Sequence, residues 1–203
     1  MILAIDSASA ACTAALLNLD GELVAERHEE IGRGHAERLM PMVADLIGDH
    51  VPSQVLVGVG PGSFTGLRVA IAAAHGMAIG WSVPLAGFDS LALVAATAPG
   101  DGPVAVAMLG GHGEWFVAQY DRPTFAIVTP VTSMAPDDAA RAITAPLVVG
   151  SAAQALVELR GHGEALALLP HAARALDLPP ALRSLDPRPV YARAPDAKPA
   201  VAA

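Results

Sequence analysis

The segment with the clearest potential for chemistry is a glycine-rich loop in the first half of the chain. The loop runs Gly60-Pro61-Gly62-Ser63-Phe64-Thr65-Gly66 and leads into Leu67 and Arg68. An apolar run precedes it and a helical pattern follows it, and at such a junction successive backbone N–H groups can form an anion-binding nest. Thr65 is a candidate N-cap for that helix. The loop is therefore a candidate phosphate-binding site.

The known phosphate-binding and nucleophile patterns do not fit this loop. It lacks the Gly-Lys-Ser/Thr ending of a Walker loop and the G-x-G-x-x-G pattern of dinucleotide-binding proteins. It also fails the G-x-S-x-G pattern, because Pro61 and Thr65 flank Ser63 where glycines are needed. The alternative is a tight structural turn that lets a helix approach a sheet closely. We expect the loop to act mainly through backbone shape, so that Gly62→Val harms folding or assembly whereas Ser63→Ala is mild.

Asp6 is a second candidate, because it ends an apolar run where actin-like ATPases place a metal-linked carboxylate. Those enzymes continue into a glycine turn that wraps phosphate, whereas this chain continues Ser7-Ala8-Ser9-Ala10. A cap at the strand end by Asp6 or Ser7 is the alternative, and both interpretations stay open. We assign no catalytic residue.

The histidines and the single cysteine do not form a recognisable metal motif. His35 begins a predicted helix, and Gly-His-Gly-Glu occurs at 111–114 and again at 161–164, but no H-x-x-x-H or H-E-x-x-H spacing is found. Because Cys12 is the only cysteine, neither a disulfide within the chain nor a cysteine-based zinc site is possible. We expect Cys12 to be a small core residue. We expect no metal site and no cofactor, although a weak nucleotide site stays open.

The apolar pattern predicts the elements that position these residues in the first half of the chain. Three strands form an antiparallel meander with a turn at Asp20-Gly21. The helix after them carries an apolar stripe of Ala36, Leu39, Met40, Val43, Leu46 and Ile47, with Pro41 inside it. The predicted strands are Ile2–Asp6, Ala11–Asn18, Leu23–Glu29, Gln54–Val59 and Val83–Gly87, and the later helices are Leu67–Gly80 and Ser90–Thr97.

The second half repeats this order after a proline- and glycine-rich boundary at 99–103. The predicted elements are strands at Val104–Leu109, Glu114–Tyr120, Thr124–Val128 and Leu147–Val149, and helices at Asp137–Ile143 and Ala152–Leu159. The echo predicts an α/β protein of the actin-like ATPase or ribonuclease H-like fold. We expect an N-terminal lobe at 1–100, a smaller C-terminal lobe at 101–193 and a loose tail at 194–203.

Composition restricts the class of function. The chain has 203 residues, 53% of them hydrophobic and 16% charged, so a packed core is expected rather than disorder. Its net charge of −8 argues against a domain that grips nucleic acid by itself. We find neither a signal peptide nor an apolar run long enough to span a membrane, and we expect a cytoplasmic protein.

Taken together, four segments resemble the TsaB (YeaZ-like) family. The start is similar to its ILAIDTA opening, and the residues from His35 to Pro41 are similar to its H-x-x-x-L-x-P helix. The loop and Leu67-Arg68 match its most specific signature, GPGSFTGLR, throughout. The residues from Pro189 to Lys198 resemble its PxYxRxPDAK ending. One stretch, Leu109–Phe116, departs from the family pattern because an acidic residue and an arginine are missing.

The resemblance implies a non-catalytic scaffold or activator subunit. Such proteins pair with a TsaD-like catalytic subunit and a TsaE-like ATPase to place threonylcarbamoyl on the adenosine beside the anticodon of tRNAs that read A-starting codons. It further implies contact with tRNA only through the complex, and a homodimer when the chain is alone. Two alternatives are an ATPase or phosphotransferase of the actin-like superfamily and a glycoprotease-like peptidase, which ATP hydrolysis and metal analysis would reveal.

The predicted helix Leu67–Gly80 suggests where a partner binds, because it is apolar nearly all round. Leu67, Ala70, Ala74, Met77 and Ala78 form one face, and Val69, Ala72, Ala73, Gly76 and Gly80 form the other. A sheet can cover only one face. The alternative is burial wholly within the monomer. The predicted interface consists of His35, Leu39, Met42, Val69, Ala72, Ala73 and Gly76.

Overall fold

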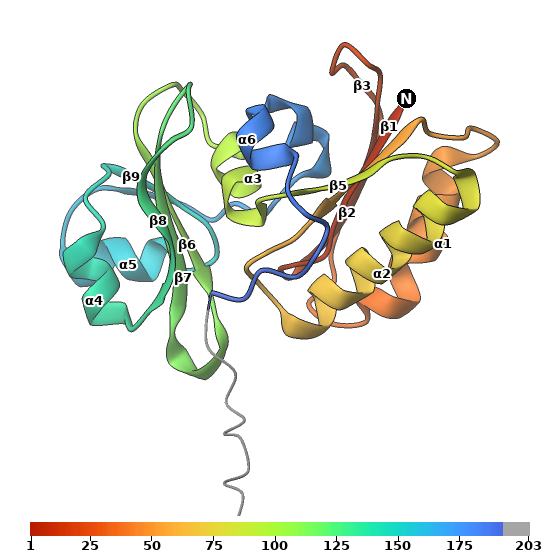
Figure 1. The fold of residues 1–203 in the computed structure, drawn as a ribbon. Coiled ribbons are helices and arrows are strands. Elements are labelled where there is room, and N and C mark those ends of the chain that lie inside the picture. Colours follow the sequence, from red (N-terminus) through yellow and green to blue (C-terminus); the bar gives the residue numbers. More distant parts are fainter. Residues whose placement is uncertain (193–203) are drawn as a thin grey trace, which may run out of the picture.

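The computed structural model describes residues 1–192 and contains two five-stranded mixed sheets with helices on their faces (Figure 1). The strand order is β3-β2-β1-β4-β5 in the first sheet and β10-β9-β6-β7-β8 in the second. The prediction of two similar α/β sheets is confirmed. The predicted tail at 194–203, with the end of the resemblance to the PDAK motif, lies outside the described residues.

The first sheet is built around β1, whose side chains are all buried. Its strands are β1 (Ile2–Asp6), β2 (Ala11–Leu17), β3 (Leu23–Glu30), β4 (Gln54–Gly58) and β5 (Leu85–Phe88). The first three form the predicted antiparallel meander, and β4 and β5 add in parallel on the other side of β1. Continuous apolar runs such as β1 and β4 suit strands that are covered on both faces.

The second sheet repeats this arrangement around β6. Its strands are β6 (Val104–Leu109), β7 (Trp115–Asp121), β8 (Ala126–Met134), β9 (Leu147–Val149) and β10 (Glu164–Leu166). A short 3-10 turn, η1 (Gly111–Gly113), joins β6 to β7. The strand β6 pairs with β7 antiparallel and with β9 in parallel. The echo between the two halves is thus a real repeat of topology.

The helices lie in three layers, one on the outer face of each sheet and one between the two sheets (Figure 1). The helices α1 (His35–Ile47) and α2 (Phe64–Trp81) cover the outer face of the first sheet, while α4 (Pro136–Ala142) and α5 (Ala153–Arg160) cover the outer face of the second. Between the sheets lie α3 (Ser90–Thr97), η2 (Ala172–Asp177) and α6 (Pro180–Arg183). Among residues 1–192, no helix is long and apolar enough to cross a membrane.

The segment after Gly161 is more ordered than its weak pattern indicates. It forms β10, η2 and α6, and Ala172, Ala175 and Leu178 pack into the core between the sheets. Its apolar residues lie on a 3-10 turn and coil, which have neither the strand nor the helix period, so the pattern is faint. The turn η2 packs on the first sheet, although it lies within the predicted second lobe. The lobe boundaries stay a prediction.

The stripe predicted for α1 is partly wrong. Ala36 and Met40 are exposed, whereas Met42 is buried together with Leu39 and Val43. The buried positions recur at steps of three and four from His35. The predicted stripe therefore included two positions, Ala36 and Met40, that lie on the solvent side of the helix. Pro41 lies on the exposed side, inside the helix. The outcome matters for the predicted interface.

Candidate functional site

The glycine-rich loop lies between β4 and α2, and the helix begins inside it. The helix α2 starts at Phe64, three residues earlier than predicted, and its N-cap is Ser63, whose Oγ accepts a hydrogen bond from the Gly66 N–H at 3.2 Å. The prediction that Thr65 caps the helix is wrong, because Thr65 lies within the first turn. Ser63 thus has a local structural task that the sequence did not identify.

The glycines of the loop lack side chains, which allows the backbone of the turn between β1 and β2 to pack directly against them. A Cβ on Gly62 would lie 2.1 Å from the Ala8 carbonyl oxygen, and a Cβ on Gly66 would lie 2.0 Å from the Ser7 carbonyl oxygen. The Ser63 N–H donates to the Ala8 oxygen at 2.7 Å, and the Ser7 hydroxyl donates to the Gly66 oxygen at 2.8 Å. Backbone therefore fills the space that a phosphate would need in an anion-binding loop.

Asp6 lies at the end of β1, where it is fully buried and links three segments. Its Oδ1 accepts from the Ala8 N–H at 2.8 Å, and its Oδ2 accepts from the Ser90 hydroxyl at 2.6 Å. Ser90 Oγ in turn accepts from the Gly60 N–H at 3.1 Å. Burial raises the pKa of Asp6, while the Ser90 and Ala8 hydrogen bonds oppose that rise. The carboxylate thus joins the β1–β2 turn, the glycine loop and α3 rather than facing solvent.

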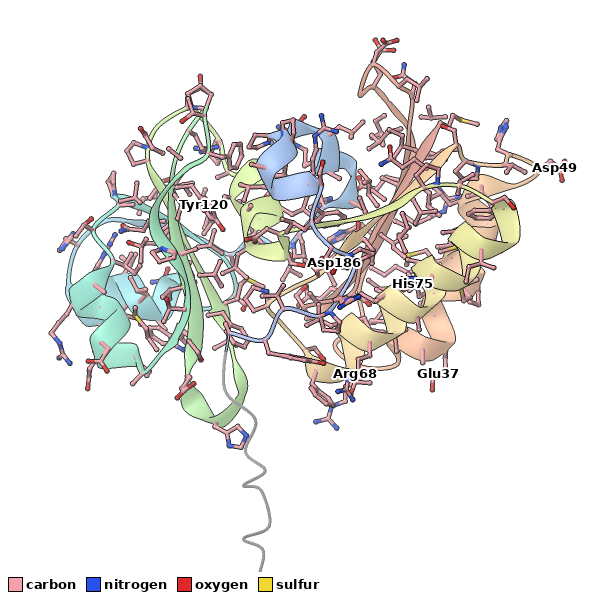
Figure 2. All side chains as sticks on the ribbon, in the orientation of Figure 1. Glu37, Asp49, Arg68, His75, Tyr120 and Asp186 are labelled. Carbon is pink, nitrogen blue, oxygen red and sulfur yellow. The ribbon has the colours of Figure 1, made fainter. Side chains whose placement is uncertain are left out.

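A second acidic group, Asp89, lies beside this cluster and caps α3. Its Oδ1 accepts from the N–H groups of Leu91 and Ala92 at 2.8 and 2.9 Å. Burial raises the pKa of Asp89 to about 6, and the nearby Asp6 adds to the rise. Burial and the Asp89 charge also raise the pKa of Tyr120, which projects from the second sheet (Figure 2). These groups form a buried polar junction between the two sheets.

Two signature residues project outward and form an exposed cluster with the end of the described chain. The Arg68 guanidinium carbon lies 3.6 Å from the centre of the Phe64 ring, and Arg68 Nε donates to the Tyr191 hydroxyl at 3.1 Å. The Phe64 and Tyr191 rings stack with centroids 5.7 Å apart. Phe64 is nevertheless 56% exposed. Tyr191 thus packs against the start of α2, far from it in sequence.

The cluster continues into one exposed face of α2. The positions Phe64, Arg68, Ala72, Gly76 and Ile79 recur at steps of three and four, so they lie in one row along the helix. Ile79 is 78% exposed, and the space beside Gly76 is open. Figure 2 shows Arg68 near the start of this helix and His75 further along it. We call the five residues the α2 face.

The predicted interface residues do not share one surface. Ala72 and Gly76 are exposed, Val69 and Ala73 are half-buried, and their position opposite the sheet-facing side agrees with the sequence pattern. Leu39 and Met42, however, are wholly buried against the first sheet, and His35 is buried as well. These three residues present no surface to a partner, because the stripe of α1 that they belong to faces its own sheet. Ile79 was missed, although its spacing from Gly76 was a usable signal.

The arrangement of the two sheets and the site between them identifies the structural class of the protein. Two repeated mixed sheets with a buried acidic junction between them form an actin-like, ribonuclease H-like architecture. A solved Pseudomonas aeruginosa structure, described as an uncharacterized protein with similarity to peptidase YEAZ, is 29% identical over 95% of this chain and 99% of that one, with a TM-score of 0.80. The solved YeaZ of the same organism is 27% identical over 94% and 98%, with a TM-score of 0.78.

The family follows from the sequence comparisons. A family model described as TsaD, tRNA N6-adenosine threonylcarbamoyltransferase, matches residues 24–172. The chain belongs to this family, within which it is a TsaB-type (YeaZ-like) member.

Curated relatives bear the name tRNA threonylcarbamoyladenosine biosynthesis protein TsaB. The Escherichia coli relative is 39% identical over 129 residues, which cover 60% of this chain and 55% of that protein. The Haemophilus influenzae relative is 34% identical over 102 residues, covering 48% and 42%. The matched part of the chain thus spans about half the length of these relatives.

Proposed function

We propose that this chain is a non-catalytic subunit of the machinery that makes threonylcarbamoyladenosine on tRNA. In this role it pairs with a TsaD-like catalytic subunit, and a TsaE-like ATPase joins them. The names of its relatives support a part in this modification. The observation that carries the non-catalytic part is the packing of the glycine loop onto the β1–β2 turn, described above.

Both features that would serve an actin-like nucleotide site are used for structure. The loop glycines sit against the carbonyl groups of Ser7 and Ala8, and the Asp6 carboxylate is buried under hydrogen bonds. A phosphate or a hydrated cation at Asp6 would have to displace the turn that these contacts hold. The net charge of −8 also favours contact with tRNA through the complex rather than through this chain alone.

The α2 face is the proposed pairing surface. It combines an aromatic ring, an arginine stacked on that ring and an exposed isoleucine, around a centre of small residues. Aromatic and arginine residues are enriched at protein interfaces, and small residues allow two helices to approach closely. Gly76 lies mid-helix, where glycine costs about 1 kcal/mol relative to alanine. The same face is the proposed contact in a homodimer of the isolated chain.

Gly76→Arg tests the surface without disturbing the monomer, because the space around Gly76 is open. Burying an unpaired charge costs about 3 kcal/mol or more, so co-purification with the cognate TsaD-like protein should weaken by at least about 100-fold. Gly111→Arg is the control, since Gly111 is exposed in the β6–β7 connection and has equally open space. Both variants should keep wild-type circular dichroism and melt at no lower temperature than the wild type, since arginine is a better helix former than the glycine it replaces at position 76. Normal pairing by Gly76→Arg would move the interface elsewhere.

Reconstitution tests the role itself. The TsaD-like and TsaE-like proteins, the threonylcarbamoyl-adenylate and tRNA should yield modified tRNA only when this chain is added. The chain with adenylate and tRNA alone should yield none, and it should not hydrolyse ATP. Modification by the isolated chain would overturn the non-catalytic proposal. Full modification without the chain would overturn the role as an obligatory subunit.

A further inference from the structure

Three potential metal ligands meet on the side of the first sheet that faces η2. Glu26 and His28 project from β3, and His171 directly precedes η2. One ligand atom from each of the three lies within 4.8 Å of the other two. His171 Nδ1 and Glu26 Oε1 are 3.0 Å apart, and the His28 and His171 rings stack with centroids 3.8 Å apart and planes 3° from parallel.

We propose that Glu26, His28 and His171 form a binding site for a divalent transition-metal ion of the zinc class. Two imidazole nitrogens and one carboxylate oxygen are a donor set that suits Zn²⁺, with water as the fourth ligand. The site is separate from the glycine loop and from Asp6, and it departs from the sequence-based expectation of no metal site. That expectation relied on short spacings along one helix, whereas Glu26 and His171 are 145 positions apart.

The unused coordination capacity of His28 supports this assignment. Its Nδ1 is buried and has no hydrogen-bond partner, which is a cost that a metal bond would remove. Glu26 supplies the negative charge that compensates part of the charge of a divalent cation.

Metal binding requires a small rearrangement that the exposure of the site permits. An ion cannot lie in both ring planes while they are parallel, so one imidazole must turn. In a tetrahedral zinc site two nitrogens at about 2.0–2.1 Å from the metal are about 3.4 Å apart. Ligand atoms that lie within 4.8 Å of one another must therefore close by at most about 1.4 Å, and His171 Nδ1 and Glu26 Oε1 are already 3.0 Å apart. His171 is 40% exposed and Glu26 is 22% exposed, so His171 can turn and solvent can supply the fourth ligand.

The bound ion would link His171 and η2 to the first sheet. The strand β3 is the edge strand of that sheet, and η2 contacts β1, β2 and β3. Without metal, the Glu26–His171 hydrogen bond and the ring stack join the two segments. With metal, three coordination bonds replace these contacts, so Zn²⁺ should stabilise the protein by binding only its folded state.

Calorimetric titration of the tag-free full chain with Zn²⁺ tests the site. We expect one ion per chain and a higher melting temperature with metal, and Co²⁺ should give the visible absorption of a tetrahedral site. Glu26→Gln, His28→Ala and His171→Ala should each weaken Zn²⁺ binding by at least tenfold, because loss of even an outer-shell partner costs about 10–100-fold. His50→Ala is the control, since His50 is exposed and outside the cluster, and it should bind as the wild type does.

His171→Cys separates a metal site from a plain ion-pair contact. Cysteine ligates zinc but cannot pair as a cation with Glu26, so this variant should retain one Zn²⁺ per chain. An ion-pair contact alone predicts that all four substitutions change stability and that neither the wild type nor His171→Cys binds zinc at this cluster. Absence of 1:1 binding by the wild-type chain, or binding that survives all three ligand substitutions, would overturn the proposal.

Discussion

Replacing Gly62 by alanine should destabilise the protein strongly, because the added methyl group has no room. Its Cβ would lie 2.1 Å from the Ala8 carbonyl oxygen, well inside van der Waals contact. Either the loop or the β1–β2 turn must move by about 1 Å, and the 2.7 Å hydrogen bond from the Ser63 N–H to the same oxygen must lengthen. Overpacking costs about 1–3 kcal/mol and a lost hydrogen bond about 0.5–1.5 kcal/mol. We expect a loss of about 2–4 kcal/mol.

Gly76→Ala is the matched control, with the opposite expected sign. Gly76 lies in the middle of α2 with open space around its Cα, so alanine should add about 1 kcal/mol through helix propensity alone. Urea unfolding of both variants, followed by circular dichroism, measures the two changes in free energy. In thermal melts each kcal/mol corresponds to about 2–4 °C for a chain of this size.

Wild-type stability of Gly62→Ala would contradict this close contact between the two turns. The glycine loop would then not be held by backbone contact with Ala8, and the space beside it would be open to a ligand. A large loss in Gly76→Ala as well would show that unfolding reports something other than local space and helix propensity.

Two further predictions concern the caps of α2 and α3. Ser63→Ala should cost about 1 kcal/mol by removing the N-cap of α2, while Thr65→Ala should be nearly neutral; equal effects in urea unfolding would show that Ser63 is not the cap. Because burial raises the pKa of Asp89 from 3.8 to about 6, the unfolded chain loses this proton first, and the contribution of Asp89 to stability falls as the pH rises between those values. Asp89→Asn keeps a side-chain oxygen that can accept the cap hydrogen bonds, and it removes the pH-dependent loss of stability because asparagine does not ionise. It should therefore gain up to about 3 kcal/mol over the wild type between about pH 4 and pH 7; a difference that does not vary with pH would contradict the buried, raised-pKa state.

Local patterns in the sequence were enough to predict most strands, most helices and the repeat of the two halves. Strands such as Ile2–Asp6 are continuous apolar runs between turn signals, and α2 has an apolar face of helical period. The close packing of the loop glycines was also accessible, because glycines clustered between a strand and a helix indicate a close approach of backbone. These properties depend on neighbouring residues, so they can be found without the rest of the chain.

Tertiary structure decided which residues are available to act. Burial of Leu39 and Met42 depends on the phase in which α1 meets its sheet. Because each residue turns a helix by about 100°, a small error in the assumed phase moves positions at the edge of the stripe between the buried and the exposed side. Ser63 rather than Thr65 caps α2 because the backbone of the β1–β2 turn sets where the helix begins. The meeting of Glu26, His28 and His171 requires the chain to return from the second sheet to the first. Contacts between such distant segments leave no periodic trace in the sequence, because each partner satisfies only its own local pattern.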